Sequence, residues 1–290
     1  QALTPLLVPP ALLPPALAFS SAGLQGAIIA GPALGGLIYS AEPAVTYGVC
    51  AALFALATTL SAQIRYQHAP AQAEPMTLHS LLAGVRFVAA HKVVLGAVSL
   101  DLFAVLLGGA TALLPMFAKD ILHVGAWGLG LLRASPAVGA LLMSVLLTRR
   151  PVRRHTGPLL LGSVAVYGLA MLVFGLSTAL LLSMAALVVS GAADMVSVVI
   201  RQTLVQLETP DAMRGRVSAV NSLFIGASNQ LGEFESGATA AWLGPVGSVV
   251  LGGLGTLVVA GLWLRLFPAL ARRNALLPGG TGQPVAGAQA

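Results

Sequence analysis

The chain has 290 residues, of which 57% are apolar and only 8% are charged, and its mean hydropathy is +0.90. So few charged side chains cannot cover a water-facing surface, which excludes a soluble globular protein and indicates an integral membrane protein. Lys and Arg total 15 against 9 Asp and Glu, a formal charge of +6. Because cations also gather at membrane edges, we interpret this excess as topological and expect no nucleic acid partner.

Apolar stretches of about 20 residues, the length that crosses about 30 Å of hydrocarbon, recur along the chain. They predict an all-α protein with about eight transmembrane helices. The expected spans are residues 16–39, 43–65, 93–118, 126–148, 157–177, 179–204, 213–242 and 245–267.

Two segments interrupt or follow these spans. Residues 66–92 contain TLHSLLAGVRFVAAHK, whose apolar positions recur at helical spacing and predict an amphipathic helix on the membrane surface. The tail, residues 275–290, is rich in Gly, Pro, Ala and Gln, and we expect it to be disordered.

Basic residues gather in alternate connections between the spans. They occur in residues 66–92, in the loop TRRPVRRH, in residues 208–216 and after residue 264, whereas the other side receives only Lys119 beside Asp120. Because Lys and Arg are retained on the cytoplasmic side of short loops, this pattern predicts a cytoplasmic C-terminus.

Residues 1–40 align without a gap with residues 202–241, matching Gln1 with Gln202 and Pro9 with Pro210. Such a repeat is typical of transporters built from two similar bundles. It predicts about 110 further residues before Gln1, in a parent of about 400 residues with two six-helix halves. We therefore interpret 1–65 as the remnant of an N-terminal bundle (the end of helix 4 with helices 5 and 6), 66–92 as a cytoplasmic linker, 93–274 as a C-terminal six-helix bundle and 275–290 as the tail.

Three stretches resemble the major facilitator superfamily, in its enterobactin-exporter-like and macrolide-efflux-like branch. They are GAIIAGPALGG at residues 26–36, DLFAVLLGGATALLPMFAKDIL at 101–122 and RQTLVQLETPDAMRGRVSAVNSLFIGASNQLGEFESG at 201–237. The first is similar to the antiporter motif of drug and proton exchangers, through Gly26, Gly31, Pro32, Gly35 and Gly36.

The resemblance implies helices 5–12 of a twelve-helix secondary transporter in the bacterial inner membrane, one that exports small amphiphilic molecules in exchange for protons by alternating access. A separately encoded N-terminal half would then be a further partner. By itself the 290-residue chain is expected not to transport, and the alternative is an inactive or scaffolding membrane-protein remnant.

Ionisable residues inside the spans are informative, because one at the bilayer centre costs upward of about 2.5 kcal/mol. We expect Arg133 to pair with Glu233 or Glu235 near the outward mouth, with the other carboxylate free to exchange a proton; a static clamp is the alternative. The two glutamates differ by about 200° around a helix, so only one can face a cavity. The candidate proton and substrate pathway comprises Asp101, Arg133, Asp194, Asn229, Glu233 and Glu235.

Other charges receive different interpretations. Arg201 is expected to extend to the cytoplasmic edge, and Asp194 either serves the pathway or bonds to a nearby serine. Asp211, Arg214 and Arg216 are expected at the cytoplasmic face, where the resemblance implies that they hold the two bundles together; a purely topological role is the alternative.

The Gly-Pro segment predicts close helix packing. Gly31 and Gly35 form a small-xxx-small pair that lets a neighbouring helix approach, while Pro32 frees a backbone carbonyl and bends the span. Helix packing without a gating role is the alternative.

No motif for an enzyme is present in the sequence. The histidines lack metal-ligand spacing, and neither a Ser-His-Asp arrangement nor a phosphate-binding loop occurs. We therefore expect no enzymatic activity, no catalytic residues, no metal and no cofactor.

Overall fold

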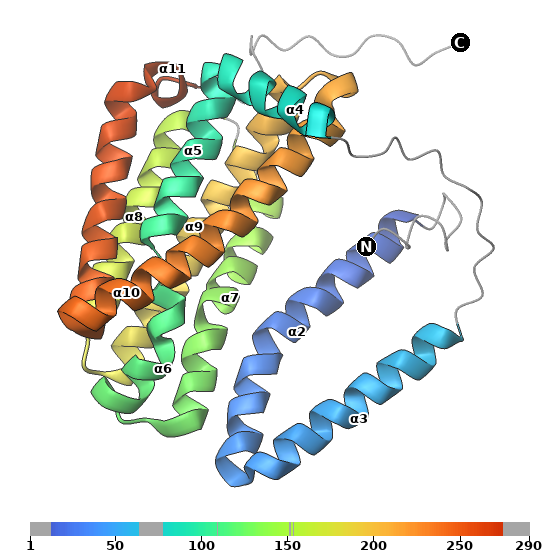
Figure 1. Ribbon diagram of the computed structural model, residues 1–290, viewed down its shortest axis with the longest axis vertical. Coiled ribbons are helices and arrows are strands. Elements are labelled where there is room, and N and C mark those ends of the chain that lie inside the picture. Colours follow the sequence, from blue (N-terminus) through green and yellow to red (C-terminus); the bar gives the residue numbers. More distant parts are fainter. Residues whose placement is uncertain (1–12, 64–77, 109, 151, 153, 275–290) are drawn as a thin grey trace.

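The computed structural model describes residues 13–63, 78–108, 110–150, 152 and 154–274 (Figure 1). All secondary structure in these ranges is helical, which confirms the predicted all-α class. The elements are α2 Leu13–Ala41, α3 Pro43–Ala62, α4 Leu78–Ala90, α5 Lys92–Leu107, η2 Ala110–Leu113, α6 Leu114–Met116, η3 Phe117–Ile121, α7 Gly125–Arg149, α8 Thr156–Leu176, α9 Leu180–Glu208, α10 Asp211–Leu266 and α11 Pro268–Ala271.

Helix α10 consists of two membrane spans. Its 56 residues would extend about 84 Å at 1.5 Å per residue, far more than one bilayer crossing. At Gly244 the backbone takes φ 74° and ψ 166°, a conformation that glycine tolerates, and Pro245 follows. The chain reverses direction here (Figure 1), so the boundary predicted between residues 242 and 245 is confirmed.

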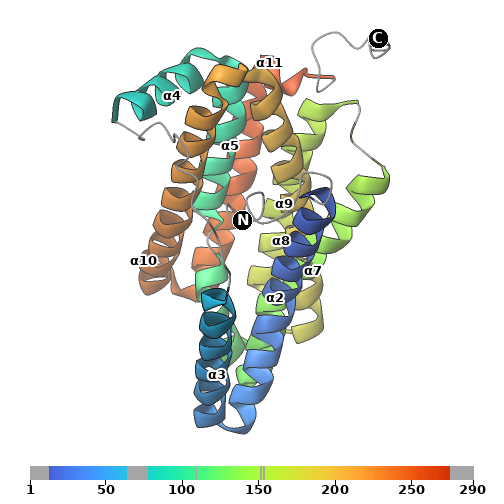
Figure 2. The same ribbon diagram turned by 90° about the vertical axis from the view of Figure 1, so that its right-hand side faces the viewer.

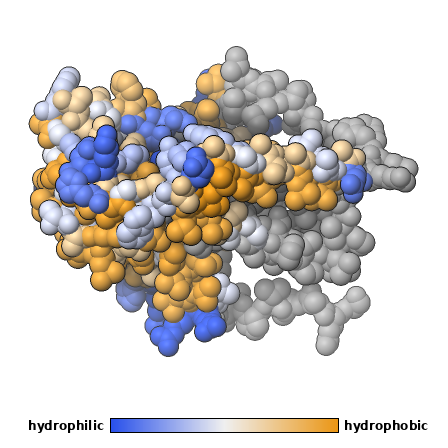
Figure 3. Space-filling model, turned by 90° about the horizontal axis from the view of Figure 1, so that it is seen from below, coloured by the Kyte–Doolittle hydropathy of each residue, from blue (hydrophilic) through white to orange (hydrophobic). Residues whose placement is uncertain are grey.

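Six helical segments in the described ranges are long and apolar enough to cross a membrane, and α10 is one of them. The apolar part of α2 at residues 26–41 is shorter. Large apolar side chains such as Phe54, Leu181 and Trp242 are exposed, and Figure 3 shows apolar residues over much of the surface seen from below. This exterior suits hydrocarbon rather than water.

The basic residues lie mainly at one end of the bundle. There α4, α11, the α7–α8 connection and the α9–α10 turn come together, at the top of Figure 1. The backbone carbonyl of Arg273, after α11, is bonded to the start of α8 at this end. It accepts hydrogen bonds from Gly157 N at 2.9 Å and from Thr156 Oγ1 at 3.1 Å. The Arg273 side chain forms an ion pair with Glu208, which ties α9 to the same point.

The predicted amphipathic helix is α4, which lies across this basic end (Figure 1). It packs on the first half of α10, where Val88 is buried and a Cβ placed on Gly84 would lie 2.8 Å from Val220 Cγ2. Leu82 and Val85 stay exposed. Helix α4 therefore caps the bundle through one face and presents apolar side chains on another.

Helices α2 and α3 form a hairpin beside the bundle and meet it along α7 (Figures 1 and 2). A Cβ on Gly36 would lie 2.5 Å from Ala126 O, and a Cβ on Gly130 would lie 2.5 Å from Pro32 O. Apart from the adjacent residues and backbone of α2 itself, no atom of the described residues lies within 4 Å of a Cβ built on Gly26, Gly31 or Gly35. Among the described residues Gly31 and Gly35 make no close helix contact, because the face of α2 that meets α7 carries Pro32 and Gly36, about 100° away around the helix.

Candidate functional site

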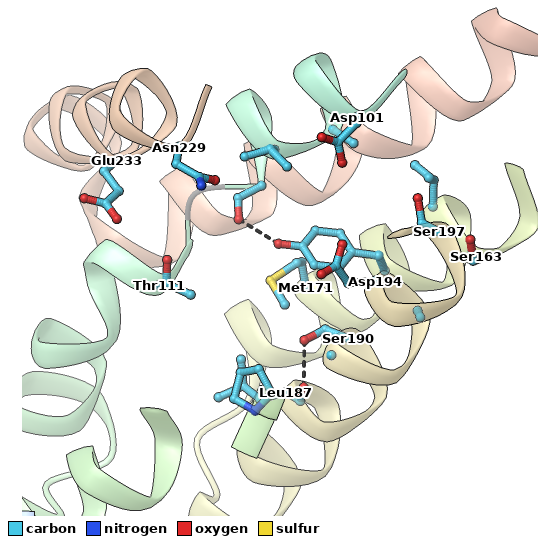
Figure 4. Close-up of a pocket in the computed structure, with 18 residues that line it drawn as sticks. Asp101, Thr111, Ser163, Met171, Leu187, Ser190, Asp194, Ser197, Asn229 and Glu233 are labelled. Atoms are coloured by element: carbon cyan, nitrogen blue, oxygen red, sulfur yellow. Dashed lines mark hydrogen bonds between the residues drawn. The ribbon is translucent and has the colours of Figure 1, made fainter. Parts of the chain in front are cut away.

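A cavity of about 220 Å³ lies between α5, α7, α8, α9 and α10 (Figure 4). Apolar side chains such as Val164, Met171 and Leu187 make up much of its wall. The polar side chains that line it are Asp101, Thr111, Ser163, Tyr167, Ser190, Asp194, Ser197, Asn229 and Glu233. An apolar cavity with a few convergent polar groups is the usual form of a small-molecule site.

A close contact between α7 and α9 at a glycine positions one wall of the cavity. Gly191 on α9 approaches α7 so closely that an added Cβ would lie 2.6 Å from the carbonyl carbon of Pro136. Both residues line the cavity. This contact brings α9 and α7 together on one side, while the polar face of α9 that carries Ser190, Asp194 and Ser197 borders the space.

Asp101 on α5 and Arg201 on α9 form a buried ion pair beside the cavity. Asp101 is 8% exposed and lines the cavity, whereas Arg201 is 3% exposed and does not. The prediction that Arg201 extends to the membrane edge is therefore wrong. With a carboxylate from the neighbouring helix as counter-charge, the guanidinium does not need to reach water.

The positions of Asp101 and Arg201 in the sequence could have indicated this pair. Asp101 follows the start of α5 by nine residues and Arg201 precedes the end of α9 by seven, so they lie at similar depths of about 14 Å and about 10 Å from the same end. Opposite charges at matched depth on two spans are candidates for pairing.

Asp194 lies two helical turns from Arg201 on α9 and faces the cavity (Figure 4). Its side chain is exposed to this space and makes no hydrogen bond or ion pair with any described residue. The serine bond considered as its alternative role is not formed, because Ser190 Oγ donates instead to Leu187 O at 2.8 Å.

The two glutamates of α10, Glu233 and Glu235, face in different directions. Asn229 and Glu233, one turn apart, both line the cavity, whereas Glu235 does not and is half-buried (Figure 4). The 200° rotation between positions 233 and 235 accounts for this difference.

Arg133 lies away from the cavity. It lines a groove between α2 and α7 together with Gly36, Tyr39 and Thr46, and its side chain is exposed. Within the described ranges no ion pair joins it to Glu233 or Glu235. The predicted pairing is wrong, because Arg133 is three residues from Gly130 and so shares the face of α7 that meets α2, not α10.

Several lining residues were missed by sequence reasoning. Tyr167 donates a hydrogen bond from its hydroxyl to Gly108 O at 2.9 Å, bracing the point where α5 ends. On α9, the spacing of Ser190, Asp194 and Ser197 places three polar side chains on one face of an otherwise apolar span. That polar stripe is a signal that would have found the serines.

Of the loop charges at residues 211–216, Arg216 is described, and it does not line this cavity. Arg216 is half-buried at the basic end, where its Nη1 donates to Met213 Sδ at 3.8 Å. The side chains of Asp211 and Arg214 lie outside the described set. In the part of the chain that the structure covers, no three His, Cys, Asp or Glu side chains come together to hold a metal ion.

A multi-pass helical bundle around a partly polar intramembrane cavity defines the class of this protein, an integral membrane protein of the major facilitator type. Residues 1–276 match the family described as transmembrane secretion effector, and the chain belongs to that family.

Three relatives illustrate the likeness. The chain is 30% identical over 275 residues to the enterobactin exporter EntS of Citrobacter koseri, covering 94% of this chain and 65% of that relative. It is 28% identical over 272 residues to the proteins of the same name from Escherichia coli O1:K1 and Shigella boydii serotype 18, covering 93% of this chain and 65% of each. The chain thus spans about two thirds of the length of these relatives.

Proposed function

We propose that this chain acts in secondary active transport, as the part of a proton-coupled exporter that handles small amphiphilic molecules by alternating access. The observation that carries the proposal is the intramembrane cavity, whose polar lining includes three acids and an amide from three different spans, Asp101, Asp194, Asn229 and Glu233. Membership of a secretion family and likeness to proteins named as exporters support the outward direction.

The cavity wall supports an alternating-access mechanism. Helix α5 ends at Leu107, Gly108 is not helical, and η2 begins at Ala110; Gly108 and Thr111 of η2 both line the cavity. Helix interruptions beside a binding site are common in transporters, because unwound backbone is tolerated where it lines a cavity. Tyr167, through its bond to Gly108 O, would hold this break in one geometry.

Asp194 and Glu233 are our candidates for proton carriers. Each faces the cavity without a counter-charge among the described residues, so each can gain or lose a proton without breaking an ion pair. Asp101 is less suited to this role because a proton on its carboxyl group would break the ion pair with Arg201. In this proposal the basic end of the bundle faces the cytoplasm, following the distribution of Arg and Lys.

The test is proton-coupled transport in everted membrane vesicles that contain the protein expressed from its natural gene. Addition of a transported amphiphile should release protons from respiration-energised vesicles, read as recovery of a quenched acridine dye. Asp194→Asn and Glu233→Gln should each reduce that recovery at least about tenfold, because an amide carries no titratable proton.

Asp120→Asn is the matched control, since Asp120 is exposed and does not line the cavity. Full recovery in both cavity variants would refute the proton-carrier roles. If no amphiphile tested moved protons in the unmutated protein, the alternative of a scaffolding protein without transport would be favoured.

A further inference from the structure

We propose that the cavity between α5, α7, α8, α9 and α10 selects cationic ligands, namely small molecules that join a positively charged nitrogen to an apolar ring or chain. The inference rests on the proposed function, because it takes the cavity as the substrate site.

The charges that line the cavity have one sign. Its ionisable lining residues are the acids Asp101, Asp194 and Glu233 together with Tyr167, and the described residues at its wall include no Lys, Arg or His. An anion entering this space would meet carboxylates in a medium of low dielectric, where repulsion between like charges is strong.

The buried arginine beside the cavity, Arg201, already has a counter-charge. Arg201 pairs with Asp101 and lies behind the cavity wall, so its guanidinium cannot receive an anionic ligand without giving up a buried partner. This pair cancels the charge of Asp101 and leaves Asp194 and Glu233 as the uncompensated charges that face the space.

The other intramembrane arginine is placed elsewhere. Arg133 lines the groove against α2 and is absent from the cavity wall. The α7 face that carries Arg133 therefore meets the hairpin, while the same helix contributes only the uncharged Pro136 to the cavity.

The remaining wall suits the apolar part of such a ligand. Met171, Val164 and Leu187 offer apolar contact, and methionine adapts to ligands of different shape. The Tyr167 ring offers an electron-rich face that attracts cations. Asn229 and Ser197 add polar atoms that can orient a ligand without changing the sign of the site.

The inference can be tested by equilibrium binding of two permanently charged probes of nearly the same shape. Benzyltrimethylammonium and benzylsulfonate share a benzyl group and carry tetrahedral heads of opposite charge. Each would be titrated calorimetrically into the 290-residue chain in lipid nanodiscs, with empty nanodiscs as the blank. We expect the cation to bind at least about tenfold more tightly than the anion.

Variants test whether the preference for the cation arises from the acids of the cavity. Asp194→Asn and Glu233→Gln should each weaken cation binding about tenfold, whereas Asp194→Glu, which keeps the charge, should keep it within about threefold. Asp120→Asn and Glu42→Gln are the matched controls, since both acids are exposed outside the cavity and should leave the affinity unchanged. Circular dichroism and gel filtration would establish that each variant is folded.

Equal binding of the two probes, tighter binding of the anion, or no cation binding by the folded chain would overturn the inference. So would unchanged affinity in both cavity variants. Because binding needs no proton gradient, a chain that prefers the cation but moves no protons would refute the proposed transport alone. A chain that transports without preferring cations would refute this inference alone.

Discussion

The Asp101–Arg201 pair shows how two charged residues can be accommodated inside a membrane. Each side chain is almost fully buried, and each supplies the counter-charge that the other needs. Such a pair gains little over well-packed apolar side chains, because the attraction is offset by loss of hydration. Removing only one of the two residues is costly, because the charge of the other is then left buried without a partner.

Arg201→Met should therefore destabilise the chain by about 3–5 kcal/mol, because it leaves the Asp101 carboxylate unpaired. The double variant Asp101→Leu with Arg201→Met should recover most of that loss. The measurement is reversible chemical unfolding in detergent micelles, followed by tryptophan fluorescence. Arg265→Met, at an exposed arginine, is the control, and a double variant as unstable as the single one would contradict the pairing argument.

At the scale of elements, α2 is attached to the bundle through one narrow face. The backbones of α2 and α7 come together where Gly36 and Gly130 leave no room for a side chain. Helix α3 has no buried residue among those described and packs against α2. The position of the whole hairpin against the bundle therefore depends on a few small residues in α2 and α7, as is common for membrane helices.

Neighbouring glycines in α2 provide a direct comparison. Gly36→Ala should destabilise the α2–α7 contact by about 1–3 kcal/mol, since its Cβ would lie 2.5 Å from Ala126 O. Gly35→Ala meets open space and should stabilise the helix by up to about 1 kcal/mol. Protease protection of the hairpin in detergent would report the difference, and equal protection of the two variants would show that the contact does not hold α2 in place.

The whole molecule is polarised along its length, with basic residues at the end that carries α4 and α11 (Figure 1). At the bottom of Figure 1 lie the α2–α3 connection, which contains the exposed Glu42, and α6, which precedes the exposed Lys119 and Asp120. Because Lys and Arg are retained on the cytoplasmic side of short loops, we propose that the end with α4 and α11 is the inner one. The cavity acids lie between these two ends, where a gradient of protons could act on them.

Cysteine labelling can test this orientation, because Cys50 is the single cysteine of the chain. In a Cys50→Ser background, Asp120→Cys should react with a membrane-impermeant maleimide on intact spheroplasts. His155→Cys, in the basic loop, should react only after the membrane is opened. The reverse pattern would place the basic end outside and would contradict the proposed topology.

Much of the architecture follows from local sequence patterns. Hydropathy and the lengths of the apolar stretches predicted α2, α3, α5, α7, α8, α9 and α10, and Gly244 with Pro245 lies at the predicted break in α10. The single span expected over 93–118 is wrong in one respect, because α5 ends at Leu107 and the short helices η2, α6 and η3 follow it. Helical rotation alone separated Glu233 from Glu235, because the period of 3.6 residues is a local property. The amphipathic pattern likewise predicted α4.

The composition of the cavity was decided only by tertiary structure. The hydropathy pattern indicates how deep in the membrane Asp101, Arg133 and Arg201 lie. It does not indicate which helix each of them faces. The tilt and rotation of α7 turn Arg133 toward α2, and those of α5 and α9 bring Asp101 to Arg201. The physical reason is that span length and depth are set by the bilayer, residue by residue, whereas rotation and partner choice are set by close packing between helices at small residues such as Gly130 and Gly191.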